Sequence, residues 1–139
     1  MKKGFTLIEL LVVISIIGIL VAVAMTSYTS TQIKARDSRR RSDMKAIQTV
    51  MEQYYATNGG YPATINAAFT SLLIPAPVDP KNTDPYQYKL YEKISAINDT
   101  YCICAKLEES NKGNASNTAA SGCTWGGNQH QYFCVQNQQ

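Results

Sequence analysis

Charged residues are almost missing from the first quarter of this 139-residue chain, where Glu9 is the only one between Gly4 and Ile33. A segment this apolar excludes a uniformly soluble protein. The net charge of +3 arises mainly in residues 34–45, which hold six Lys or Arg against two Asp. Residues 58–139 hold five Lys against six Asp or Glu, so their charge does not indicate nucleic-acid binding.

Histidine is nearly absent too: His130 stands alone among Gln and Asn residues. The sequence offers no catalytic constellation and no phosphate-binding glycine loop, since Gly126-Gly127-Asn128 is typical of a turn. We therefore expect a protein that is not an enzyme and that holds no cofactor and no metal.

Proline is missing between Leu10 and Tyr61, which allows one uninterrupted helix from about Phe5 to Thr57. Asn58-Gly59-Gly60 can supply left-handed capping conformations, and Pro62 prevents continuation. About 50 residues of helix cannot all be buried in one small domain.

The run from Leu7 to Met25 is apolar apart from Glu9, Ser15 and Gly18, and as a helix it would span about 28 Å, which is enough to cross a bilayer. A conventional secretory signal peptide is the simpler interpretation, because Lys2 and Lys3 precede the run and Ala22-Val23-Ala24 fits a cleavage site. Glu9 argues against it, since a carboxylate in a lipid-inserted stretch is costly and suggests a partner.

The stretch Lys3-Gly4-Phe5-Thr6-Leu7-Ile8-Glu9-Leu10 resembles the class III signal sequence of type IV pilins and of type II secretion pseudopilins. The resemblance implies a leader, residues 1–4, that a prepilin peptidase cuts after Gly4. It also implies methylation of the new amino terminus at Phe5 and a role for Glu9 in assembly. Many pilins carry a proline where this chain has Thr26, and that departure removes one cause of a kink.

Glu9 also has a physical interpretation. Cleavage after Gly4 would create an amine at the same end of the apolar helix, and in a staggered bundle the amine of one subunit can neutralise Glu9 of the next. In an apolar environment such pairing would fix the axial register. A carboxylate that lies at the lipid headgroup boundary is the alternative.

The second half of the long helix is patterned differently. Met44, Ile47, Val50, Met51, Tyr54 and Tyr55 recur at helical spacing and predict a stripe that packs against a C-terminal body. Residues 34–43 are highly charged, and we expect them to be solvated or to meet charged neighbours. Arg39, Arg40 and Arg41 fan around the helix, with Asp37 and Asp43 placed for local pairing.

The C-terminal body is predicted to hold a short helix at residues 65–73, whose buried side is Ile65, Phe69, Leu72 and Leu73, and strands at residues 86–94, 100–107 and 131–136. The fold class is α+β: a long N-terminal helix against a small antiparallel sheet, which is the pilin fold. The expected divisions are a leader at 1–4, a transmembrane and polymerisation helix at 5–29, its amphipathic continuation at 30–57 and a globular head at 58–139.

Four cysteines, Cys102, Cys104, Cys123 and Cys134, lie in the predicted head. Strand alternation places Cys102, Cys104 and Cys134 on the sheet face away from the helix, so we expect two disulfides, each joining one of the 102/104 pair to one of the 123/134 pair. Which pairing holds is open at this stage. A zinc site is the alternative, but the spacing fits it poorly.

The sequence thus predicts a type IV pilus subunit that polymerises into an extracellular filament. Alternatives are the major pseudopilin of a secretion or competence system and a secreted binding domain released after Ala24. Partners implied by the resemblance are further copies of the chain, the prepilin peptidase and an inner-membrane assembly platform with its ATPase.

Lysines at both ends of the apolar run leave the orientation of this helix in a membrane ambiguous. The resemblance places the leader in the cytoplasm and the head outside, with single-pass storage in the cytoplasmic membrane before assembly.

Overall fold

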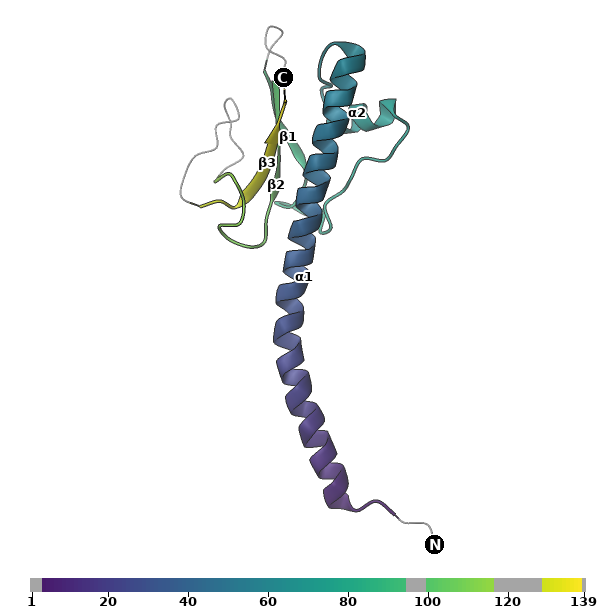
Figure 1. The fold of residues 1–139 in the computed structure, drawn as a ribbon, viewed down its shortest axis with the longest axis vertical. Coiled ribbons are helices and arrows are strands. Elements are labelled where there is room, and N and C mark those ends of the chain that lie inside the picture. The colour runs from purple at the N-terminus through teal and green to yellow at the C-terminus, as the bar shows by residue number, and fades with distance from the viewer. Residues whose placement is uncertain (1–3, 95–99, 117–128, 139) are drawn as a thin grey trace. The chain divides into compact units, whose positions relative to one another are not determined.

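The computed structural model describes residues 4–94, 100–116 and 129–138. Figure 1 shows the order of elements: α1 (Leu7–Asn58), α2 (Ile65–Ser71), β1 (Lys89–Ile94), β2 (Thr100–Lys106) and β3 (Tyr132–Gln136). The strands form one antiparallel sheet in the order β1-β2-β3. The chain divides into two compact units, Met1–Lys34 and Ala35–Gln139. The predicted α+β pilin fold is confirmed.

Helix α1 is 52 residues long and begins and ends at identifiable caps. At its start, the Glu9 amide donates to Thr6 Oγ1 (3.3 Å), while the Thr6 amide donates to Glu9 Oε2 (2.9 Å). This reciprocal capping box moves the start of the helix two residues beyond the predicted Phe5. At its end, Gly59 adopts a φ of 70° and donates its amide to the Tyr55 carbonyl, as the Asn58-Gly59-Gly60 signal predicted.

The predicted stripe of the second half of α1 forms the core of the second unit. Met44, Ile47 and Met51 are fully buried there, and Val50 is nearly so. They pack in one cluster with Tyr101, Ile103 and Ala105 of β2, Val135 of β3, and Tyr61, Ala68 and Phe69 from the segment between helix and sheet. The sheet lies beside this part of α1 (Figure 1). The predicted stripe is confirmed, because residues at helical spacing lie on one side of a helix and that side is buried here.

Helix α2 differs from its prediction at its C-terminal end. Thr64 caps its start and Phe69 is buried, as expected. The helix stops at Ser71, however, and the predicted burial of Leu72 and Leu73 is wrong: their exposed fractions are 36% and 92%. The cause is a turn in which Leu73 adopts a φ of 57°, a left-handed conformation that costs a non-glycine residue about 1 kcal/mol.

Strand β1 begins three residues later than predicted, at Lys89. Tyr86 lies instead in a turn, where its amide donates to the Thr83 carbonyl and its ring faces the guanidinium of Arg40 at 4.7 Å. The Tyr88 hydroxyl donates to Asp43 of α1 at 2.8 Å. These side-chain interactions with α1 draw residues 86–88 away from the sheet.

Candidate assembly site

The apolar half of α1 has exposed side chains along its whole length. From Leu7 to Met25 the large apolar residues are between 47% and 81% exposed. The helix is long and apolar enough to cross a membrane, with a mean hydropathy of 3.0 over 18 residues. Its hydroxyls bond within the helix: Ser15 donates to the Leu11 carbonyl and Thr31 to the Ser27 carbonyl, both at 2.8 Å. A hydroxyl satisfied in this way can enter an apolar environment at little cost.

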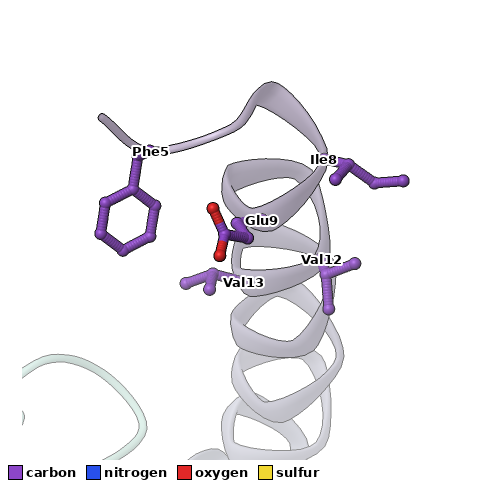
Figure 2. Close-up of a pocket in the computed structure, with 5 residues that line it drawn as sticks. All are labelled: Phe5, Ile8, Glu9, Val12 and Val13. Carbon is purple, nitrogen blue, oxygen red and sulfur yellow. The ribbon is translucent and has the colours of Figure 1, made fainter. Parts of the chain in front are cut away.

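The carboxylate of Glu9 lies in the first turn of α1, at the start of this apolar surface. Figure 2 shows the Glu9 carboxylate on the same side of α1 as the Phe5 ring and Val13. Together with Ile8 and Val12 they line an open depression of about 350 Å³. Glu9 Oε2 accepts both hydrogen bonds from Thr6, from its amide at 2.9 Å and from its hydroxyl at 2.8 Å. The carboxylate is thus held at the helix terminus while it remains exposed.

The packing of this unit gives no reason for glycine at residues 4 and 18. A Cβ built on Gly4 or Gly18 meets nothing within 4 Å, and neither residue has a positive φ. Glycine is therefore not required at either position by the single chain. At residue 18 the missing side chain leaves a place where another helix can approach the backbone closely.

The charged part of α1 is only partly solvated: Lys34 and Arg39 are exposed, whereas Asp37 and Arg40 are buried within the second unit. Arg40 is fully buried. Its guanidinium donates from Nε and Nη2 to the Asp79 carboxylate (2.7 and 3.1 Å), and from Nη1 to Asp37 (2.7 Å) and Glu108 (2.8 Å). The local pair with Asp37 was anticipated, whereas Asp79 and Glu108 come from distant segments. Both expectations therefore describe part of this stretch, because Arg40 meets charged neighbours while Arg39 is largely solvated.

Two further cations complete this ion cluster, which we define as Arg36, Asp37, Arg40, Asp79, Lys81 and Glu108. Arg36 donates two hydrogen bonds to the Glu108 carboxylate, at 2.7 and 2.8 Å, and Lys81 Nζ lies 2.8 Å from Glu108 Oε2. The hydrogen bonds from Arg36, with those from Lys81 and Arg40, hold the pKa of Glu108 far below its usual range although burial opposes this. Three cations and three carboxylates balance, which is what allows burial of so many charges.

The cluster also fixes the backbone around it. Asp37 accepts the amides of Glu108 and Glu109 at 2.9 to 3.1 Å, and Asp79 accepts the amide of Lys81 at 2.8 Å. The end of β2 and the loop before β1 are thereby tied to one point of α1. Arg39, in contrast, is exposed, and its ion pair with Asp43 is long at 3.8 Å. Arg41 makes no ion pair among the described residues, and its Nη2 donates to the Lys112 carbonyl.

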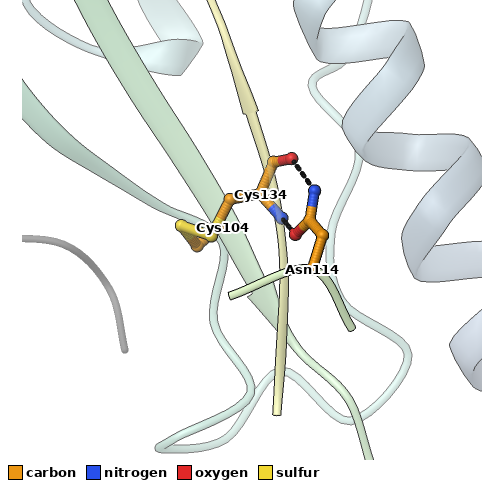
Figure 3. Close-up of a disulfide and its surroundings, with 3 residues drawn as sticks. All are labelled: Cys104, Asn114 and Cys134. Atoms are coloured by element: carbon orange, nitrogen blue, oxygen red, sulfur yellow. Dashed lines mark hydrogen bonds between the residues drawn. A yellow bond between two sulfur atoms is a disulfide. The ribbon is translucent and has the colours of Figure 1, made fainter. Parts of the chain in front are cut away.

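A disulfide joins the central strand β2 to the edge strand β3. Cys104 of β2 and Cys134 of β3 are direct neighbours in the sheet and are covalently linked (Figure 3). They lie with Ala115 in a small buried cluster apart from the main core, as the strand alternation predicted. Cys102 also takes part in a disulfide. Cys123 lies outside the described residues.

Asn114 binds the backbone of Cys134 beside this bridge. Its side-chain amide donates to the Cys134 carbonyl at 2.9 Å and its Oδ1 accepts the Cys134 amide at 2.8 Å (Figure 3). The side chain thus satisfies the outer edge of β3 as another strand would. Gly113 enables the approach, because a Cβ there would overlap the Tyr132 carbonyl.

No group of three or more His, Cys, Asp or Glu residues suited to a metal ion is found among residues 4–94, 100–116 and 129–138. His130 is exposed. The predicted site residues therefore fall in two places: Gly4, Phe5 and Glu9 at the start of α1, and the described cysteines in the sheet.

Comparison with known proteins agrees with the features of both units. Residues 1–25 match the prokaryotic N-terminal methylation motif. The chain is 36% identical over 60 residues to the type IV major pilin protein PilA of Myxococcus xanthus, covering 43% of this chain and 27% of that protein. It is 37% identical over 68 residues to the type IV major pilin protein PilE1 of Neisseria gonorrhoeae, covering 49% and 41%.

A further similarity reaches into the second unit. The type II secretion system core protein G of Escherichia coli is 34% identical over 92 residues, which cover 66% of this chain and 62% of that protein. No solved structure matches the chain. The chain spans between about a quarter and three fifths of the length of these relatives.

A methylation motif, a long apolar N-terminal helix and a small antiparallel sheet define a pilin-like structural subunit. Over the matched segments the chain is similar to type IV major pilins and to a type II secretion system core protein G.

Proposed function

We propose that this chain is a structural subunit of a type IV pilus and has no enzymatic activity. Residues 1–4 act as the leader, a prepilin peptidase cuts after Gly4, and Phe5 becomes the methylated amino terminus. The observation that carries the proposal is an uncharged, exposed helical surface that begins directly after Glu9 and continues to Met25. In a single chain in water, these apolar side chains would be exposed to solvent, which is unfavourable. A bilayer or other copies of the same helix would bury them.

The subunit is stored in the cytoplasmic membrane through residues 5–29 and leaves it when an assembly platform and its ATPase add it to an extracellular filament. There the apolar helices form the core, residues 30–57 lead out of it and residues 58–139 form the exposed head. Gly18 supports this arrangement, because its missing side chain lets neighbouring helices pack closely.

Glu9 sets the register of the bundle. Once the leader is removed, the amine of Phe5 in one copy neutralises Glu9 in the next. Glu9 stays exposed and is held on one side of the helix by Thr6, so it is accessible to such a partner. An unpaired carboxylate in the apolar core would be costly, and each copy is therefore added at one axial position.

The experiment compares Glu9→Gln with Ser15→Ala in cells that assemble the wild-type protein. Glu9→Gln removes a charge and Ser15→Ala removes a hydroxyl from the same apolar stretch, but the Ser15 hydroxyl donates to the Leu11 carbonyl of its own helix. We expect both variants to accumulate in the membrane, the Ser15 variant to form normal filaments and the Glu9 variant to form few. Normal filaments from Glu9→Gln would contradict the registration role.

The alternative is the major pseudopilin of a secretion system. One observation favours this alternative: the alignment with core protein G covers 66% of the chain and is longer than the alignments with the two pilins. Purification of sheared surface filaments separates the two functions. This chain as the bulk protein of long filaments supports the pilus, whereas its absence from them together with a secretion defect in a deletion strain supports the pseudopilus.

A further inference from the structure

The turn after α2 exposes a second apolar surface, which we call the α2 patch and define as Leu72, Leu73, Ile74 and Val78. Their exposed fractions are 36%, 92%, 44% and 52%. The patch belongs to the second unit and takes no part in the core or in the ion cluster. Large apolar residues this exposed and this close in sequence mark an interaction surface.

The backbone makes leucine an unexpected residue at the centre of the patch. The Ile74 amide donates to the Phe69 carbonyl and the Leu73 amide to the Thr70 carbonyl, which together form a Schellman motif. Leu73 holds its left-handed position, with a φ of 57°, where glycine is preferred. Folding favours neither the exposed leucine side chain nor its backbone conformation. The reason for a leucine here therefore lies outside the single chain.

The surroundings of the patch indicate what covers it. Residues 58–78 contain no Asp, Glu, Lys or Arg. A surface without basic residues is poorly suited to an anionic membrane surface or to an acidic partner. Among the described residues, the other exposed large apolar side chains all lie between Phe5 and Tyr28 of the first unit. That segment is also uncharged from Leu10 to Ile33.

We propose that the α2 patch is a docking surface for the apolar part of α1 in a second copy of this chain. The inference rests on the proposed filament function and deepens it: the head contributes to cohesion through Leu73 and its neighbours, in addition to the helix bundle. The match is one of two uncharged, exposed surfaces, each of which removes the other from water.

The test substitutes Leu73→Gly in the full-length protein, with Asn111→Gly as the matched control. Asn111 also has a positive φ, 59°, and is an exposed residue of the same unit, but it is polar. Both changes relieve a left-handed non-glycine residue, so the thermal midpoint of each variant in detergent should be unchanged or higher. Only Leu73→Gly should lower the filament yield, by about tenfold or more. A second variant, Leu73→Asn, keeps a residue that tolerates this conformation and should show the same loss.

A photoreactive amino acid at position 73 identifies the occupant. In filaments we expect a covalent dimer whose linked peptide falls within residues 5–34. A dimer linked through another head, or an adduct with lipid alone, would overturn the proposal. So would wild-type filament yields from Leu73→Gly. If the wild-type chain itself forms no filaments, the proposed function fails. If the wild type, Asn111→Gly and Leu73→Gly all form them, only this inference fails.

Discussion

Substitution of Arg40 by methionine should lower the free energy of unfolding of the second unit far more than substitution of an exposed arginine of α1. Methionine keeps much of the length of the side chain but removes the charge and the donors. Asp37, Asp79 and Glu108 would then lose the guanidinium that bonds all three at 2.7 to 3.1 Å. Carboxylates that are almost fully buried would be left facing one another with only Arg36 and Lys81 to neutralise them.

The expected magnitude follows from the burial of the arginine. Arg40 is 0% exposed, and removing one partner from a buried ion pair costs about 3–5 kcal/mol. Arg39 is the matched control, because it is the preceding residue on the same helix. Its side chain is 62% exposed and 3.8 Å from Asp43, so Arg39→Met should cost less than about 0.5 kcal/mol.

Urea unfolding of the full-length chain in detergent, followed by the near-ultraviolet circular dichroism of its tyrosines, measures both variants. The midpoint should fall sharply for Arg40→Met and hardly change for Arg39→Met. Added salt should not narrow the difference, since the cluster is shielded from solvent. A loss below about 1 kcal/mol for Arg40→Met would refute the conclusion that the cluster holds the head to α1.

Three further predictions concern pH and the disulfide. Because Arg36 and its neighbours lower the pKa of Glu108 in the folded chain, its stabilising contribution is complete above the unfolded value of about 4.3 and is lost as the pH falls below it. Urea midpoints should therefore drop below about pH 5, and Glu108→Gln should flatten that drop. Burial raises the pKa of Tyr101, so stability should decline above about pH 10, and Tyr101→Phe should reduce that decline. Peptide mapping of unreduced protein should recover Cys104 linked to Cys134, whereas free thiols at both positions in native protein would contradict the bridge. Replacing Cys104 and Cys134 together by Ala, which leaves the disulfide of Cys102 in place, should lower the free energy of unfolding by about 3 kcal/mol.

Local patterns in the sequence were sufficient to predict α1 and its buried stripe. A helix needs only the absence of proline and a capping signal, both of which are short-range features. The alternation in β2 likewise placed Cys104 away from Ile103, because neighbouring residues of a strand point to opposite faces. The capping box of Thr6 and Glu9 was not predicted, although the Thr-x-x-Glu spacing is a sequence signal for it.

The ion cluster could not be predicted because its members are far apart in the chain. Arg40 lies 39 residues from Asp79 and 68 from Glu108, so only the folded loop and the end of β2 bring them together. The exposed turn at Leu73 was missed for a different reason. Two leucines at helical spacing after Phe69 fit a buried side, but the chain leaves the helix after Ser71 and turns them outward.

The most direct test of this account is the amino terminus of the subunit recovered from the cell surface. Intact mass and N-terminal sequencing of protein from sheared filaments should give a chain that starts at Phe5 and carries one added methyl group. A chain that starts at Met25 would show that the apolar helix is discarded. A chain that starts at Met1 would show that no amine forms beside Glu9. The start at Met25 would contradict polymerisation through α1, and the start at Met1 would contradict the registration role of Glu9.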